Sequence, residues 1–227
     1  KINQTLEEIG KAIFKHWFVD FEFPDDQGRP YKSSGGEMLD SKLGEIPKGW
    51  EVGKVEDCLE LVYGKGLPQK KRESGKVPVY GSNGLIDYHN NSFVKGPGII
   101  IGRKGTVGEI NISYVDFWPI DTTYYVKSNM NNVILSWYYL LKSLKLDRMN
   151  VHSAVPGLNR NDVYEILLPI PDKKLLIEFE ELICLLHTEI NQNEKQIENL
   201  SQIRDSLLPK LMSGKIRIDI KIKDEGG

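Results

Sequence analysis

The chain has 227 residues, of which 40% are hydrophobic and 27% charged, and its formal net charge is −2 at pH 7. This length is enough for one sizeable core with an appended element, and no apolar run approaches the roughly 20 residues of a transmembrane helix. The amphipathic, acidic N-terminus and the two isolated cysteines, Cys58 and Cys184, indicate neither a signal peptide nor a disulfide scaffold. We therefore expect a cytoplasmic protein with reduced thiols and no membrane partner.

The small net charge hides a segregation along the chain. Residues 61–160 hold 13 Lys and Arg against 6 Asp and Glu, whereas the remainder holds 17 against 26. A basic middle between acidic flanks favours an anionic partner for the middle alone, although a merely solvated surface would have the same composition.

The N-terminal segment Ile2–Phe18 predicts a helix that repeats the C-terminal region of the chain. A shift of 191 positions places Leu6 on Ile197 and Ile9 on Leu200, and such repeats bear on the whole fold. The shared apolar stripe here is Ile2, Leu6, Ile9 and Ile13. The helix opens in mid-heptad after Lys1, which indicates a piece of a longer protein.

The polar segment 24–45, rich in Gly, Ser and Pro, predicts a linker or surface loop. Residues 46–171 predict an α+β domain dominated by an irregular sheet, because short β-branched and aromatic runs alternate with Gly and Pro. The expected helix spans Val133–Lys145. The expected strands are Glu51–Val55, Val77–Tyr80, Gly98–Gly102, Glu109–Ser113, Thr122–Lys127 and Val163–Leu168.

The C-terminal region, residues 172–227, predicts a long helix from Asp172 to about Leu208 and a tail, with Pro209 and Gly214 ending the helix. Its apolar residues follow a heptad with a polar interruption that is typical of a register-fixing position. The heptad positions expected to pair helices are Ile183, Leu186, Ile190, Asn193, Ile197, Leu200 and Leu207. The alternative is an amphipathic helix that lies on a globular core.

The basic middle carries no recognisable active site. The segment GIIIGRKGTVGEI at 98–110 is not a Walker A motif, because Gly105 follows Lys104, and it does not open a helix as a dinucleotide-binding loop does. It instead predicts a hairpin whose glycines lift Arg103 and Lys104 clear of the sheet; a plain surface hairpin is the alternative. The four histidines lack metal-ligand spacing, and His152–Ser153 lacks the third group of a catalytic triad.

Several segments together resemble the specificity (S) subunits of type I restriction–modification systems. The segments that resemble a target recognition domain are LGEIPKGWEV at 43–52, VYGSNGLIDY at 79–88, GIIIGRKGTVGEI at 98–110, DTTYYV at 121–126 and AVPGLNRNDVYEILLPIP at 154–171. Residues 1–23 and 193–216 resemble the central and distal conserved helices of these subunits. The resemblance implies a C-terminal half of a two-domain subunit, with a natural half-subunit that homodimerises as the alternative.

What the resemblance implies is a non-catalytic reader of double-stranded DNA that assembles with methyltransferase (M) and restriction (R) subunits. S-adenosylmethionine, ATP and Mg²⁺ are then expected on the partner subunits, and no cofactor or metal on this chain. The alternatives are a protein-interaction coiled-coil module and a nuclease, for which Pro171–Asp172 and Asp219–Lys221 give only a chance PD…DxK match.

The residues expected at the DNA are basic or small polar side chains in loops, which suit phosphates and base edges. Lys65, Lys70, Lys71 and Arg72 form a basic run that we expect to be mobile and to contact the backbone, although it could be only solvated. Asn159 could instead hold its own turn together. The full set is Lys65, Lys70, Lys71, Arg72, Ser82, Asn83, Arg103, Lys104, Thr106, His152, Ser153, Asn159 and Arg160.

Overall fold

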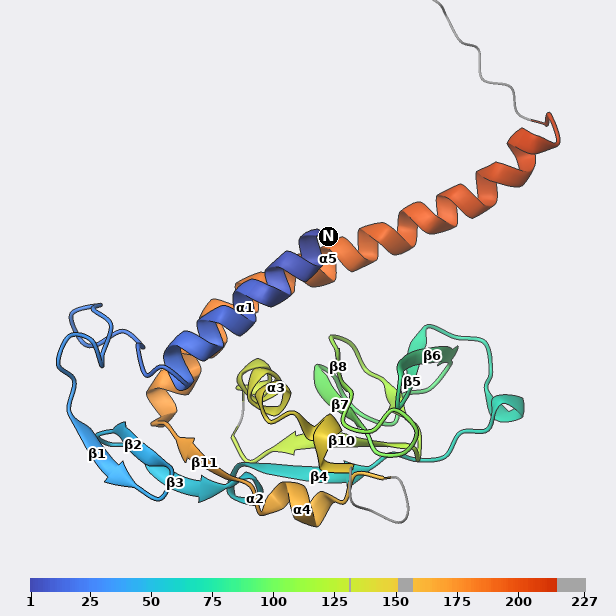
Figure 1. The fold of residues 1–227 in the computed structure, drawn as a ribbon. Coiled ribbons are helices and arrows are strands. Elements are labelled where there is room, and N and C mark those ends of the chain that lie inside the picture. Colours follow the sequence, from blue (N-terminus) through green and yellow to red (C-terminus); the bar gives the residue numbers. More distant parts are fainter. Residues whose placement is uncertain (131, 151–156, 216–227) are drawn as a thin grey trace, which may run out of the picture. The chain divides into compact units, whose positions relative to one another are not determined.

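The computed structural model describes residues 1–130, 132–150 and 157–215. Two compact units divide the chain, residues 1–186 and residues 187–227. The first unit combines helices with small sheets, as the sequence predicts, and the second contains the continuation of the long helix α5 (Lys173–Met212) (Figure 1).

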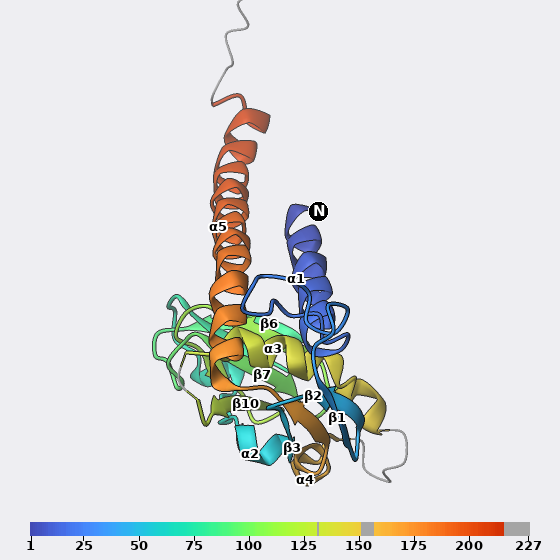
Figure 2. The same ribbon diagram turned by 90° about the vertical axis from the view of Figure 1, so that its left-hand side faces the viewer.

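Helix α1 (Ile2–Phe18) has the bounds that the sequence predicts, and one face of it is buried. Its buried residues, Gly10, Phe14 and Phe18, are four apart and therefore lie one above another on the helix. The rings of Phe14 and Phe18 contact Phe179 at the start of α5, with centroid distances of 5.8 and 4.9 Å. Figures 1 and 2 both show α1 running alongside this first part of α5.

The isoleucine stripe of α1 is only partly covered within this chain, and its pairing with another helix stays a prediction. Ile2 and Ile9 are 68% and 42% exposed, whereas Leu6 and Ile13 are half-buried. The aromatic face is buried in their place because large rings bury more apolar area each. On α5, Ile183 is fully buried in the same core and Leu186 packs against it.

The main sheet of the first unit is antiparallel and has the strand order β4-β10-β7-β8. A second sheet has the order β6-β5-β9, and β11 pairs with β3. The bounds are β3 (Glu51–Lys54), β4 (Leu59–Tyr63), β5 (Val77–Gly81), β6 (Gly84–His89), β7 (Gly98–Gly102), β8 (Ile110–Ser113), β9 (Trp118–Pro119), β10 (Thr123–Ser128) and β11 (Leu167–Ile170).

Short helices connect and cover these sheets. Helix α3 (Ile134–Ser143) lies within the predicted span, and its buried residues Trp137, Tyr139 and Leu141 join the core. The others are α2 (Val55–Cys58), α4 (Arg160–Tyr164), and the 3₁₀ helices η1 (Gln69–Lys71) and η2 (Leu146–Asn150).

One predicted strand is wrong in its first half. Residues 163–168 were expected to be extended, but Val163 belongs to α4, and the strand β11 begins only at Leu167. Asn159 caps α4 because its side-chain oxygen accepts a hydrogen bond from the backbone N–H of Asn161 at 3.0 Å. Asn, Asp and Ser at this position favour the start of a helix. The helix therefore forms although Val163 is a β-branched residue, which would favour a strand.

The predicted linker 24–45 is also more ordered than its composition indicates. Strands β1 (Met38–Ser41) and β2 (Gly44–Pro47) form an antiparallel hairpin at its end. Upstream, Arg29 pairs with Asp25 at 2.8 Å and closes a tight turn. The hydrogen bonds and the arginine side chain lower the pKa of Asp25.

In the second unit, helix α5 continues past the predicted stop at Pro209. The helix ends at Met212, and Gly214 follows with φ of +69°, a conformation that favours glycine. Pro209 lies in the last turn, and its ring removes one N–H, the donor that would otherwise bond to the carbonyl of Asp205. Of the pairing residues expected here, Ile190 is 3% exposed and Asn193 half-buried, whereas Ile197, Leu200 and Leu207 are 61%, 64% and 40% exposed.

Across residues 1–130, 132–150 and 157–215, the structure contains no helix long and apolar enough to cross a bilayer. In the same ranges, Cys58 is buried and Cys184 exposed, and neither is in a disulfide. Burial raises the pKa of the Cys58 thiol to about 11, so it stays protonated at neutral pH.

Candidate nucleic-acid interface

Three of the predicted loops converge at one end of the main sheet. The β5–β6 turn carries Ser82, whose Oγ would lie 3.1 Å from a Cβ added at Gly105 in the β7–β8 loop. The backbone N–H of Leu158 donates a hydrogen bond to the carbonyl of Arg103 at 2.8 Å, which brings the segment before α4 against the same loop. Glycine at 105 suits this approach because its φ is +81°.

Arg103, directly after β7, is held against the sheet. Its guanidinium lies over the rings of Tyr63 and Tyr124, with Cζ 4.9 and 5.8 Å from the centroids. Nη2 donates to the backbone oxygen of Asp121 at 3.1 Å, whereas Nε is buried without a partner in the described residues. The expectation that glycines lift Arg103 clear of the sheet is therefore wrong, because cation–π contacts hold it down. Lys104 is exposed, as expected.

Arg160, the first residue of α4, reaches the same tyrosine. Its Cζ lies 5.2 Å from the centroid of Tyr63, and Nη1 donates to the carbonyl of Leu61 at 3.4 Å. Helix α4 is fixed to β4 by the Tyr164 hydroxyl, which accepts a hydrogen bond from the N–H of Leu61 at 2.8 Å. We refer to Tyr63, Arg103, Tyr124 and Arg160 as the arginine–tyrosine cluster.

The two arginines of the cluster carry charge that no nearby carboxylate neutralises. Within the described residues neither forms an ion pair, unlike Arg72, which pairs with Asp87 at 3.0 Å. Burial raises the pKa of Tyr124 to about 12, so its hydroxyl stays neutral and donates to the carbonyl of Leu158 at 2.9 Å. The cluster is thus a rigid site of positive potential suited to an anion or a base edge.

The remaining predicted loop residues differ in their exposure and in the hydrogen bonds that their side chains make. Asn83 and Thr106 are exposed in their turns. Asn159 is exposed but engaged, since besides capping α4 its Nδ2 donates to Asp162 at 3.1 Å. The alternative that Asn159 holds its own turn is therefore confirmed. His152 and Ser153 lie outside the described residues.

The basic run at 65–72 includes the 3₁₀ helix η1 and makes several side-chain contacts. Lys65 lies over the rings of Phe93 and Trp118, at 5.5 and 5.8 Å from their centroids. Lys70 and Lys71 are exposed on η1. Arg72, by contrast, is mostly buried and bonded to Asp87, whose pKa it lowers, so it stabilises the loop rather than facing a ligand.

The two tyrosines of the cluster, Tyr63 and Tyr124, were not selected from the sequence. Tyr63 is 47% exposed at the end of β4, a strand missed in the sequence, and its ring is tilted against that of Tyr124 with the centroids 5.1 Å apart. Only the register that pairs Tyr63 with Tyr124 places these rings together. The described ranges contain no group of three or more His, Cys, Asp or Glu that could hold a metal ion.

The chain is similar to known specificity subunits over most of its length. The type I restriction enzyme MjaIX specificity subunit of Methanocaldococcus jannaschii is 30% identical, over 96% of this chain and 55% of that protein. The HindI specificity subunit of Haemophilus influenzae is 22% identical, over 95% of this chain and 63% of that protein. The chain thus spans about half to two thirds of the length of these relatives.

The fold has a solved counterpart, and a family model covers most of the chain. The crystal structure of the type I restriction–modification S subunit from M. genitalium superimposes with a TM-score of 0.63 and 22% identity, over 92% of this chain and 55% of that one. This likeness shows the fold. Residues 47–200 match the family described as the type I restriction modification DNA specificity domain. The chain therefore belongs to the family of type I restriction–modification specificity subunits.

Proposed function

We propose that this chain is a non-catalytic reader of double-stranded DNA that recognises one half of a bipartite target. The observation that carries the proposal is the arginine–tyrosine cluster, in which Arg103 and Arg160 share Tyr63 without a carboxylate partner in the described residues. An arginine fixed in this way keeps its guanidinium planar and oriented, so the N–H groups that are not used within the chain can donate to a guanine edge or a phosphate with little loss of entropy on binding.

The surrounding residues supply contacts of a different kind. Lys70, Lys71 and Lys104 are exposed on loops and suit phosphates, which set register without reading sequence. Ser82, Asn83 and Thr106 are short polar side chains in the converging turns, and they suit base edges or phosphates. Family membership supports the same assignment, since both relatives are named as specificity subunits of restriction enzymes.

The proposal extends to partners. M and R subunits would assemble on the conserved helices and would carry S-adenosylmethionine, ATP and Mg²⁺, with no cofactor needed for reading by this chain. The helices would act as a ruler between half-sites, because a helix advances about 1.5 Å per residue and duplex DNA about 3.4 Å per pair. A homodimer of this chain would read a symmetric target instead.

The decisive experiment is selection from a pool of random duplexes, with salt titration and sequencing of the bound fraction. The unchanged chain should enrich a short half-site, or two inverted copies at fixed spacing. Arg103→Lys keeps the charge but loses the planar guanidinium. The discrimination between bases at one position of the selected site should therefore fall by about 1–3 kcal/mol. Lys70→Ala should weaken binding uniformly and lower the salt slope by about 0.9.

Arg29→Ala is the matched control, since Arg29 pairs with Asp25 in the segment before β1 and should leave the selected sequence unchanged. An unaltered motif in Arg103→Lys would refute the role of Arg103. No binding by the unchanged chain even at low salt would favour the protein-interaction module.

A further inference from the structure

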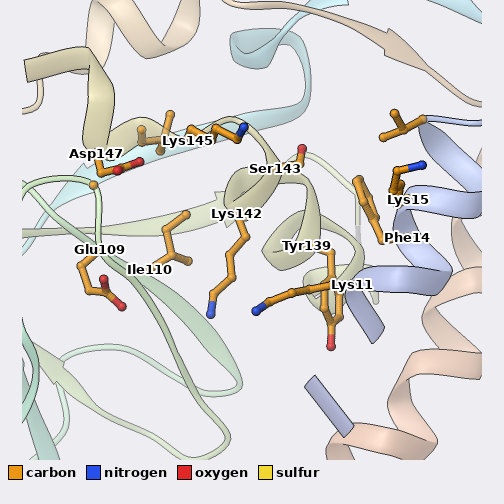
Figure 3. Close-up of a pocket in the computed structure, with 13 residues that line it drawn as sticks. Lys11, Phe14, Lys15, Glu109, Ile110, Tyr139, Lys142, Ser143, Lys145 and Asp147 are labelled. Atoms are coloured by element: carbon orange, nitrogen blue, oxygen red, sulfur yellow. The ribbon is translucent and has the colours of Figure 1, made fainter. Parts of the chain in front are cut away.

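A second concave site lies between α1, the end of α3 and the turn before β8. It encloses about 680 Å³, within the size range of small-molecule sites. Its floor is apolar and aromatic, with Phe14 from α1, Tyr139 from α3 and Ile110 from β8 (Figure 3). Gly108 closes one side, where a side chain would collide with the backbone of Leu146 and Asp147. We refer to this site as the lysine-lined cavity.

Four lysines from separate parts of the chain line this cavity. They are Lys11, Lys15, Lys142 and Lys145, and two carboxylates, Glu109 and Asp147, complete the charged lining. In Figure 3 the side chains of Lys11 and Lys142 extend toward one another.

Three of these lysines have acidic neighbours. Lys11 bonds to Glu8 at 2.6 Å and Lys15 to Asp20 at 2.6 Å, but both lysines are substantially exposed, at 43% and 65%. Lys142 lies 3.8 Å from Glu7. The Lys11 and Lys15 pairs are exposed, contribute little to stability and are screened by salt, so these two ammonium groups can turn toward a bound anion, whereas Lys142 is less exposed and also lies over the Tyr138 ring at 4.7 Å.

Lys145 adds an independent sign of function. It occupies the left-handed region, with φ of +52°, directly after the C-cap of α3. Glycine is the usual residue at this position, because a side chain there strains the backbone. The Lys145 ammonium also makes no hydrogen bond or ion pair within the described part of the chain. Strain retained without a local contact indicates a role for the side chain at the cavity.

We propose that the lysine-lined cavity binds a mononucleotide. The lysines suit its phosphate, the aromatic floor suits a base, and the carboxylates of Glu109 and Asp147 suit its hydroxyl and amino donors. A DNA backbone offers phosphates but few donors, so the two carboxylates would repel it. No nucleotide-binding motif in the sequence marks this site, because its lysines come from positions 11, 15, 142 and 145.

The test is calorimetric titration of the 227-residue chain with AMP and, separately, with inorganic phosphate. AMP should bind more tightly than phosphate, because only AMP reaches the floor. Lys145→Gly should weaken AMP binding by about tenfold or more, since a charge-assisted hydrogen bond is lost. The same substitution should leave the thermal midpoint unchanged or higher, because glycine relieves the strain. Lys145→Arg should retain most of the affinity.

Controls separate this site from the DNA interface. Lys42→Gly, an exposed lysine in the β1–β2 turn, should leave the AMP titration unchanged. Arg103→Ala should impair duplex binding without affecting AMP. Absence of AMP binding, or equal AMP affinity in Lys145→Gly, would overturn the proposal. Displacement of AMP by a duplex in a Lys145-dependent manner would assign the cavity to DNA phosphate and would also overturn it.

Discussion

Glu180 joins α5 to helix α3 through a single carboxylate. Its Oε1 accepts from the N–H of Leu135 at 2.9 Å, and its Oε2 accepts from the N–H and the hydroxyl of Ser136, both at 2.7 Å. Helix α3 has no capping side chain of its own at Val133, so Glu180 supplies from another element the acceptor that a helix N-terminus needs.

Removing this carboxylate should destabilise the fold. Glu180→Ala leaves the N–H groups of Leu135 and Ser136 without their acceptor, and we expect a loss of about 1–3 kcal/mol in the free energy of unfolding. Urea denaturation at pH 7 measures this loss. Glu178→Ala, on the exposed side of the same turn, should change stability little, because Glu178 only pairs with Lys174 at 3.5 Å.

The burial of Glu180 makes the free energy of unfolding depend on pH. Desolvation raises the pKa of Glu180 above its usual 4.5 despite the hydrogen bonds that oppose it. The folded state therefore binds the proton more tightly than the unfolded state, and this contribution is fully present below pH 4.5 and is lost as the pH rises through the folded pKa. As the pH rises from 4.5 through the folded pKa, the unchanged protein should therefore lose stability relative to Glu180→Gln. Parallel profiles of stability against pH for the two proteins would contradict this expectation.

At the scale of elements, the sequence predicts those strands and helices whose signal lies within their own residues. The strand Gly98–Gly102 and the helix Ile2–Phe18 have the predicted bounds, because a buried run of Ile and an amphipathic period each act locally. Strand β4 and the hairpin 38–47 were missed, since their short, mixed sequences become strands only through pairing with distant or turn-linked partners.

The candidate site likewise has a part that the sequence predicts and a part that depends on the tertiary fold. Arg103 and Arg160 could be selected from the sequence because basic residues in Gly-containing loops are recognisable. Their meeting on Tyr63 could not, because it requires the β4–β10 register and the docking of α4 onto β4. The aromatic face of α1 that packs on Phe179 was not selected either, because heptad spacing gives no information on which neighbouring helix lies nearest.

The contact of α1 with α3 makes a prediction at this scale. A Cβ added at Gly10 would lie 2.5 Å from Cζ of Tyr139, so Gly10→Ala should lower stability even though alanine favours helices by about 1 kcal/mol over glycine. We expect a net loss of about 1–2 kcal/mol from overpacking. Thermal unfolding measures it, and the Gly10→Ala, Tyr139→Phe double variant should recover part of the loss. A stabilised single variant would show that α1 does not press on α3.

At the scale of the whole molecule, the second unit leaves an apolar stripe exposed. Ile197, Leu200, Ile203 and Leu207 are all at least 40% exposed on α5. Large apolar side chains that recur at helical spacing are costly in water and are typical of a surface that pairs with another helix. The polar Asn193 upstream fits a position that fixes the register of such a pair.

We therefore expect this chain to self-associate through the stripe when no partner subunit is present. Sedimentation equilibrium should detect a concentration-dependent dimer, and Ile197→Glu with Leu200→Glu should convert it to monomer, because like charges would face each other in the seam. Lys195→Glu changes the charge of an exposed residue outside the heptad positions and serves as the matched control. The monomeric variant should still enrich a single half-site but lose any preference for two inverted copies, since the proposed DNA site lies in the first unit and the stripe in the second. If the chain with the intact stripe is monomeric at all concentrations, the stripe instead pairs with a helix of another protein.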